Sequence, residues 1–199
     1  MLTRFRRQVK AHYNEGTLQR LLHSQDVQAR RAAVVALGLL GTIESNAQLA
    51  ACLQDEDELV RQFASNSLWS LWFRGGSEEE NRELEQLAAQ DDLRRALAGL
   101  TELSQRTPEF AEVYNQRAIV WFKLGEFRRS IEDCERVLAL NPYHFGAQAG
   151  MAQCYMRLNK PRAALRAFRN ALRINPNLSD VARTIRNLED ALGGGIDER

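Results

Sequence analysis

Residues 113–142 read VYNQRAIVWFKLGEFRRSIEDCERVLALNP, and this stretch decides the fold. Its closing Asn-Pro pair at 141–142 recurs at 175–176, and Thr107-Pro108 stands the same 34 residues before the first pair. Small and large apolar residues keep fixed places within each period. Small residues let paired helices approach closely, aromatic residues fill the gaps between them, and proline stops the second helix. The sequence therefore predicts stacked helical hairpins.

Two full units repeat one pattern at this period. Its positions in the first unit are Ala118, Trp121, Leu124, Gly125, Phe127, Ser130, Cys134, Val137, Leu138 and Pro142, and in the second Ala152, Tyr155, Leu158, Asn159, Pro161, Ala164, Phe168, Ala171, Leu172 and Pro176. On these residues the segment resembles the tetratricopeptide repeat (TPR) family. The resemblance implies an α-α superhelix in which the first helix of each repeat lines a concave, protein-binding groove.

The TPR array is expected to cover residues 77–192. We assign a degenerate repeat to 77–110 and full repeats to 111–144 and 145–178. The degenerate unit keeps the apolar places at Leu84, Leu87, Leu93, Ala96, Leu100, Leu103 and Pro108. Spacings of 4, 3 and 4 among Val181, Ile185, Leu188 and Leu192 predict an amphipathic capping helix over 181–192. Three glycines end it, so 193–199 is expected to be a flexible tail.

A second internal repeat, with a shift of 31 residues, lies in residues 17–75. The shift places Leu22 on Leu53, Ala33 on Ala64, Leu37 on Leu68 and Leu40 on Leu71. Each unit has a short helix, an acidic turn and a longer helix, and acidic side chains suit a helix N-terminus. The segment is similar to the HEAT family, which implies that Arg30 and Arg61 reach the turn of the neighbouring repeat. We assign HEAT-like repeats with an N-terminal helix to residues 1–76.

The two arrays join near Gly75-Gly76, where one helix pattern stops and an acidic run begins the next. Because repeat units need neighbours to bury their faces, we predict one continuous all-α solenoid, with the HEAT-like half stacked on the TPR half. Trp69, Trp72 and Phe73 crowd the end of the last HEAT-like helix. We expect them to pack the halves together, and an exposed docking patch is the alternative.

Composition restricts the classes of protein that fit. Hydrophobic residues make up 44% and charged residues 27%, as in ordinary globular proteins. No apolar run is long enough for a signal peptide or a membrane span, so a cytoplasmic location is expected. The three cysteines, Cys52, Cys134 and Cys154, fall in apolar helical patterns without metal-ligand spacing and are expected to be buried thiols.

The sequence lacks the motifs of catalytic, metal and phosphate sites. Its histidines, His12, His23 and His144, are scattered, and there is no HExxH, Cys-x-x-Cys or glycine-rich phosphate loop. We therefore expect no enzymatic activity, no cofactor and no metal. Some short HEAT-like proteins attach bilin pigments to antenna proteins, so a pigment-lyase-like enzyme is an alternative that rests on the HEAT resemblance alone.

The TPR resemblance also indicates which residues line the groove. They are Glu112, Asn115, Gln116, Ile119, Phe122 and Lys123 in one repeat and Gly146, Ala149, Gly150, Gln153, Met156 and Arg157 in the next. We predict that all of these residues except Glu112 and Gly146 contact the partner. Apolar contact from Ile119, Phe122 and Met156 favours a peptide or amphipathic helix of another protein. The last helix or the HEAT-like half could occupy the groove instead.

The match is closest to the repeats of co-chaperones, where a stretch like Tyr114 to Arg117 opens the middle repeat. That family holds the acidic C-terminus of heat-shock chaperones in a clamp of Lys and Asn side chains. Here Gln116 takes the place of the clamp asparagine, and Gly146 and Gly150 take the places of later cations. Because the charge-assisted hydrogen bonds of those cations are missing, we do not expect binding of chaperone tails.

A second surface is suggested by charge. No acidic residue occurs between Glu135 and Asp180, and a basic stripe is formed by Arg162, Arg166, Arg169 and Arg173 at spacings of 4, 3 and 4. It could bind nucleic acid or another anionic surface, pair with the acidic middle of a second copy, or be a solvated helix face. We favour the solvated face, since arginines are favourable near a helix C-terminus, and the missing stacking aromatics argue against single-stranded nucleic acid. The leading interpretation is a non-catalytic protein-interaction scaffold or adaptor with an unidentified partner.

Overall fold

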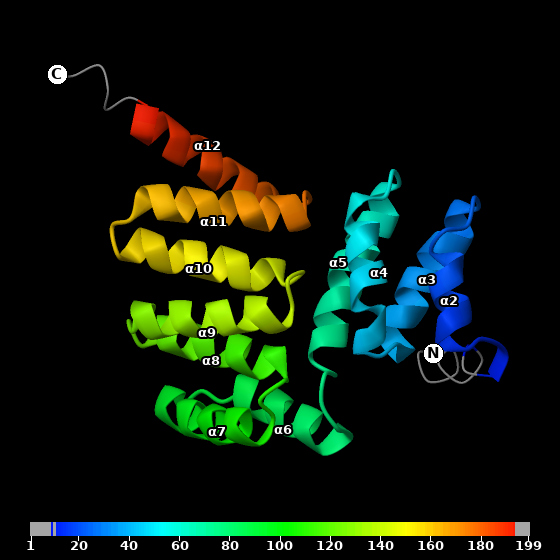
Figure 1. The fold of residues 1–199 in the computed structure, drawn as a ribbon, viewed down its shortest axis with the longest axis horizontal. Coiled ribbons are helices and arrows are strands. Elements are labelled where there is room, and N and C mark those ends of the chain that lie inside the picture. The colour runs from blue at the N-terminus through cyan, green and yellow to red at the C-terminus, as the bar shows by residue number, and fades with distance from the viewer. Residues whose placement is uncertain (1–8, 10, 194–199) are drawn as a thin grey trace. The chain divides into compact units, whose positions relative to one another are not determined.

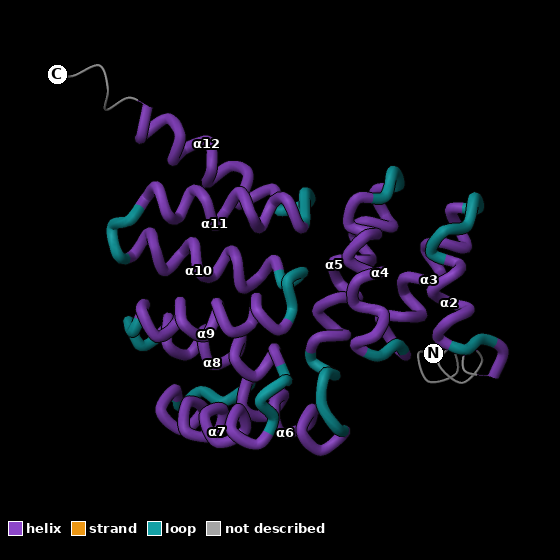
Figure 2. The backbone as a smooth tube through the Cα atoms, viewed as in Figure 1, coloured by secondary structure: helices purple, strands orange, loops and turns teal. Residues whose placement is uncertain are grey.

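The computed structural model describes residue 9 and residues 11–193, and every regular element in this part of the chain is helical (Figures 1 and 2). The prediction of an all-α fold is confirmed. The chain divides into two compact units, Met1–Asn81 and Arg82–Arg199. Most of the region expected to hold the N-terminal helix, and residues 194–199 of the expected flexible tail, lie outside the described residues. The continuous stacking of the two halves stays a prediction.

The first unit consists of short and long helices in alternation. In chain order they are α2 (Glu15–Leu21), α3 (Val27–Leu40), the 3-10 turn η1 (Ile43–Ser45), α4 (Asn46–Ala51), the 3-10 turn η2 (Cys52–Gln54) and α5 (Glu58–Trp72). The residues that the 31-residue shift superimposes form its core, since Leu22, Leu53, Leu37 and Leu68 are all buried. The long helices α3 and α5 pack against each other.

Acidic residues start both long helices, as the sequence predicted. Asp26 caps α3 by accepting from the amide of Gln28 at 2.9 Å, and Asp57 caps α5 by accepting from the amide of Val60 at 2.9 Å. Each cap satisfies an amide that lacks a partner within the helix. Acidic residues in these turns therefore set the helix boundaries.

Arginines of the first repeat hold the turn of the second. Arg30 contacts Asp55 at 2.9 Å and Glu56 at 3.0 Å, as the HEAT resemblance implied. Arg31 forms a two-bond pair with Asp57 at 2.9 and 2.6 Å. Arg61 was expected to reach the turn of a neighbouring repeat, but the hydrogen bonds it donates to the carbonyls of Asp55 and Glu56 are to the turn of its own repeat. The acidic turn is thus held by two arginines of the first repeat and one of its own repeat.

The second unit is a stack of antiparallel helices (Figure 1). It contains α6 (Glu78–Ala88, which crosses the division between the units), α7 (Leu93–Arg106), α8 (Ala111–Lys123), α9 (Phe127–Leu140), α10 (Phe145–Arg157), α11 (Pro161–Ile174) and α12 (Ser179–Gly193). The predicted repeats 111–144 and 145–178 contain the hairpins α8/α9 and α10/α11. The helix expected over 181–192 is α12, which packs on α11.

The two hairpins turn at equivalent residues. Gly125 has φ of 81° and Asn159 has φ of 54°, both in the left-handed region. Glycine adopts this conformation without steric cost, and asparagine tolerates it better than other side chains. Asparagine can therefore replace glycine in the second repeat without changing the turn.

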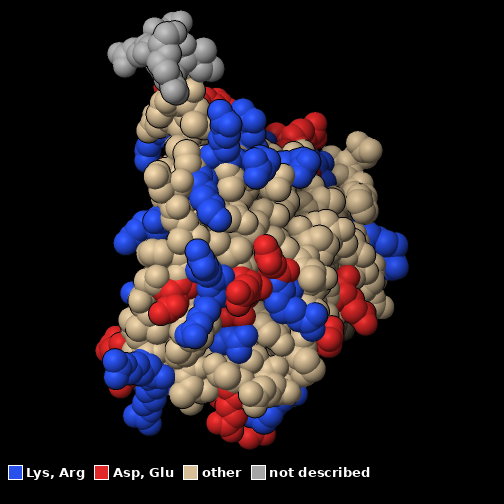
Figure 3. Space-filling model, turned by 60° about the vertical axis from the view of Figure 1, so that its left-hand side comes forward, with Lys and Arg blue, Asp and Glu red and all other residues tan. Residues whose placement is uncertain are grey.

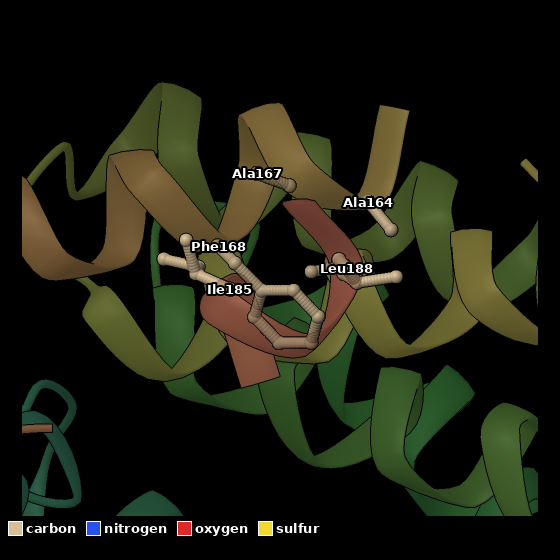
Figure 4. Packing of buried hydrophobic residues seen from close by; sticks show 6 residues of the cluster. Ala164, Ala167, Phe168, Ile185 and Leu188 are labelled. Carbon is tan, nitrogen blue, oxygen red and sulfur yellow. The ribbon is translucent and has the colours of Figure 1, made fainter. Parts of the chain in front are cut away.

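Apolar residues of α11 and α12 form one core cluster of the second unit. Figure 4 shows the ring of Phe168 lying beside Ile185 and Leu188 of α12, with Ala164 and Ala167 on α11. The small side chains on α11 allow α12 to approach closely enough to cover Phe168, which is 4% exposed. The last helix thus closes the end of the array.

The aromatic group at the end of α5 has contacts within the first unit. The indole of Trp72 donates to the side-chain oxygen of Asn46 on α4 at 2.8 Å, and the rings of Trp69 and Trp72 meet edge to face at 5.0 Å. The hydrogen bond from Trp72 to Asn46 joins α4 to α5. Packing of Trp69, Trp72 and Phe73 between the two halves stays a prediction.

Candidate protein-binding groove

An open cavity of about 330 Å³ lies in the second unit, among α8, α10, α11 and α12. Its lining combines half-buried or exposed side chains of α8, α10 and α12 with one buried ring from α11. The lining residues are Phe122, Gln153, Met156, Arg157, Phe168, Asp180, Val181 and Thr184. The last helix therefore forms one wall of this cavity and leaves it open.

Phe122, Gln153, Met156 and Arg157, all predicted partner-binding residues, line the cavity. On the same first helices, Ile119 and Met156 are each 39% exposed. Sequence reasoning missed the contribution of Phe168 and of α12, namely Asp180, Val181 and Thr184. Phe168 is an apolar position of the 34-residue pattern on α11, but the pattern does not reach Asp180, Val181 or Thr184, because α12 begins where the repeat ends.

Asn115 and Gln116 do not present their amides to this cavity. Asn115 is only 4% exposed, and its amide donates to Oε1 of Glu112 at 2.9 Å. The amide of Gln116 donates to the same oxygen at 2.6 Å. Burial of Asn115 therefore corrects its expected place on an open surface. Of the remaining predicted positions, Ala149 and Gly150 are partly buried on α10, and Lys123 is exposed at the end of α8.

A buried acid lies at the centre of this network. Oε2 of Glu112 is 3.0 Å from Nε2 of His144, and neither side chain is exposed. Nδ1 of His144 accepts from the amide of Ala147 at 3.0 Å, so His144 also caps α10. The four side chains Glu112, Asn115, Gln116 and His144 satisfy one another, which explains how a carboxylate is tolerated inside the array.

Arg157 is oriented by aromatic rings at the edge of the cavity. Its guanidinium carbon lies 4.8 Å from the ring centre of Phe127 and 5.8 Å from that of Phe122. The two rings meet edge to face at 5.4 Å. Among the described residues no carboxylate forms an ion pair with Arg157 or with Lys123. Arg157 thus lines the cavity without an ion pair, and Lys123, which follows Phe122 in the chain, is exposed.

The basic stripe is exposed on α11 and is partly engaged within the chain. Arg169 pairs with Glu189 of α12 at 2.6 Å, and Arg173 donates to the side chain of Asn170 at 2.7 Å. Arg162 and Arg166 are exposed. In Figure 3, basic and acidic side chains intermingle over the middle of the visible face and basic ones gather toward its upper part. The pairing with Glu189 reduces the charge available to an anionic ligand.

Residues 9 and 11–193 were also searched for metal sites, membrane spans and paired cysteines. No cluster of three or more His, Cys, Asp or Glu side chains could hold a metal ion there. None of the helices in that range is both long and apolar enough to cross a bilayer. The three cysteines are buried and unpaired, as the sequence predicted.

The fold and the groove define a class of helical-repeat protein, and comparison with known proteins identifies the repeats. Residues 14–102 match the family model of HEAT repeats, and residues 122–188 match that of the tetratricopeptide repeat. The chain therefore carries HEAT-like repeats followed by TPR repeats that resemble those of co-chaperones. The HEAT match extends through α6 and into α7, which we assigned to a degenerate TPR, and that assignment stays a prediction.

Known relatives match this chain over only part of their own length. A TPR repeat-containing protein of Rhizobium etli is 34% identical over 50% of this chain and 48% of its own length. Stress-induced-phosphoprotein 1 of Caenorhabditis elegans is 27% identical over 56% of this chain and 35% of its own length. The chain thus spans less than half of these relatives.

The first TPR domain of Spaghetti (RPAP3), solved bound to an HSP90 peptide, has a similar fold. Its TM-score is 0.51 at 22% identity, and the match covers 58% of this chain and 89% of that one. At this identity the likeness shows the fold alone.

Proposed function

We propose that this protein is an interaction adaptor that binds a peptide or an amphipathic helix of a partner protein in the TPR groove. The observation that carries the proposal is the open cavity of about 330 Å³ bounded by Phe122, Met156 and Val181, with Ile119 exposed on the same face of α8. Apolar side chains that remain exposed around a concave site are typical of surfaces that bind another protein.

The likeness to TPR domains supports this choice. The RPAP3 domain was solved with an HSP90 peptide bound, which shows that a TPR fold of this kind can hold a short segment of another protein. A peptide-sized ligand is also supported by the lining of the groove, to which α8, α10 and α12 all contribute. The partner of this chain need not be a chaperone.

The proposal is tested by affinity capture from the source organism, with Phe122→Ala combined with Met156→Ala. Loss of these side chains removes apolar contact from the cavity, so a specifically captured protein should be lost. Tyr143→Ala is the matched control, since Tyr143 is 37% exposed and lies outside the cavity. Thermal unfolding by circular dichroism must show that the double variant is folded. Equal capture by the folded double variant and the wild type would rule out groove binding.

A further inference from the structure

We propose that the groove selects partner segments in which an acidic side chain stands next to a bulky apolar one. The apolar side chain enters the cavity against Phe122, Met156 and Val181, and the carboxylate meets Arg157 and Lys123. This inference rests on the proposed groove binding and adds the chemistry of the partner.

Two aromatic rings restrict the orientation of Arg157. Stacking on Phe127 at 4.8 Å and on Phe122 at 5.8 Å restricts a side chain that would otherwise sample many rotamers. A guanidinium restricted in this way loses less entropy when it binds, and its planar donors match a carboxylate. Phe122 contacts Arg157 and also lines the cavity, so the charged and apolar parts of the site are adjacent.

The repeat supplies a second cation in the equivalent place. Lys123 and Arg157 are the last residues of α8 and α10 and are separated by one repeat period. A cation at a helix C-terminus is favourable by itself, by about 0.3 to 1 kcal/mol, and that accounts for the residue type. It does not account for a guanidinium stacked at the edge of an apolar cavity without a carboxylate partner among the described residues.

The acidic group that borders the cavity does not cancel this charge. Asp180 lines the cavity from the first turn of α12, where its carboxylate accepts from Arg183 at 2.7 Å. Asp180 therefore already has a cationic partner, whereas Arg157 and Lys123 form no ion pair in the described part of the chain. Charge complementarity favours an anionic partner over a cationic one.

A side-chain carboxylate fits better than the terminal carboxylate of a chain. Near the start of α8, the amides of Asn115 and Gln116 are committed to Glu112, and His144 takes the remaining oxygen of that acid. Gly150 offers no cation there. The available cations instead end α8 and α10, and of these two Arg157 lines the cavity.

The test is a selection from a library of short random peptides displayed on phage through their C-termini, so that no peptide has a free terminal carboxylate. The full chain is the target, and the variants Phe122→Ala and Arg157→Glu are selected in parallel. We expect the wild type to enrich peptides with Asp or Glu next to Leu, Ile, Met or Phe. Arg157→Glu should enrich Lys or Arg in place of the acidic residue.

The outcomes separate the two proposals. Apolar peptides without an acidic residue, enriched equally by the wild type and by Arg157→Glu, would overturn the acidic selectivity while leaving groove binding intact. If a folded Phe122→Ala enriches the same peptides as the wild type, groove binding itself is wrong.

Affinity measurements with an enriched peptide complete the test. The peptide is synthesised with an acetylated N-terminus and an amidated C-terminus, and its binding is followed by fluorescence anisotropy. Arg157→Gln should weaken binding about threefold to tenfold, because exposed charge pairs contribute modestly, and added salt should reduce the difference. Arg166→Gln on α11 is the matched control and should bind like the wild type. Equal affinity of Arg157→Gln and Arg166→Gln would contradict the proposal.

Discussion

Nε2 of His144 and Oε2 of Glu112 lie 3.0 Å apart with both side chains fully shielded from solvent. Because Nδ1 of His144 accepts from the amide of Ala147, the hydrogen-bond network assigns the ring proton to Nε2, from which it is donated to Glu112. The pair joins the first turn of α8 to the start of α10. It therefore fastens one TPR repeat to the next.

Removing this imidazole should destabilise the TPR unit. His144→Ala leaves a buried carboxylate oxygen without its donor and uncaps α10, so we expect a loss of about 3 kcal/mol in the free energy of unfolding. His144→Asn can keep the cap, and its loss should be smaller by about 1 kcal/mol. Urea unfolding followed by circular dichroism measures both. Identical losses for the two variants would show that the cap contributes nothing.

The sequence predicted the fold because its determinants repeat. Equivalent buried residues such as Leu37 and Leu68 make the period visible without knowledge of the structure. The same holds for the left-handed turns at Gly125 and Asn159, which recur at one place in each hairpin. Packing that repeats with a fixed period can thus be predicted from a single sequence.

The groove could be predicted only in part, because its details depend on contacts between repeats. The TPR resemblance predicted Asn115 on the groove side of α8, but it could not show that Glu112 accepts from its amide and that His144 packs there. The wall formed by Val181 depends on how α12 lies on α11, outside the repeat pattern. Stacking of Arg157 on Phe127 likewise joins residues of different hairpins.

Asp57 should make the HEAT-like unit sensitive to acid. Its hydrogen bonds from Arg31 hold the pKa of the carboxyl below the ordinary value of 3.8, with a further contribution from the amide of Val60. Because the pKa is lower in the folded state, the stabilisation is complete above 3.8 and is lost as the pH falls through the folded value.

The comparison is between the wild type and Asp57→Asn, which retains a capping oxygen but not the charge. At neutral pH the variant should have the lower urea midpoint. The difference between the two urea midpoints should narrow as the pH falls below the ordinary pKa of an aspartate. A gap that stays constant over this range would contradict the assigned role of the Arg31 pair.

The cysteines should be unreactive in the folded protein. Burial raises the pKa of Cys52 to about 11 and that of Cys134 to about 12, and it also raises the pKa of Cys154. Since the thiolate is the reactive form, a disulfide reagent at mildly alkaline pH should label none of the three until urea unfolds the chain. An added exposed thiol, Ala98→Cys, is the positive control and should react at once. Rapid labelling of the wild type would contradict this burial.

Close packing of the HEAT-like helices can be tested at Gly38 on α3. A Cβ added there would lie 2.2 Å from Oγ, 2.5 Å from Cβ and 2.9 Å from Cα of Ser67 on α5. Because the last of these atoms is backbone, a rotamer change of Ser67 cannot relieve the overlap. Gly38→Ala should therefore force the two helices apart and lower the free energy of unfolding by about 1 to 3 kcal/mol.

Gly16 on α2 provides the control for this substitution. The atom nearest to a Cβ added at Gly16 is Oδ1 of Asn14, at an ordinary contact distance of 3.7 Å. Gly16→Ala should therefore leave the free energy of unfolding unchanged or raise it by up to about 1 kcal/mol. Guanidinium unfolding of both variants separates the cost of helix contact from the general effect of replacing glycine in a helix. If both alanine variants were as stable as the wild type, α3 and α5 would have to pack with more freedom than the 2.9 Å approach allows.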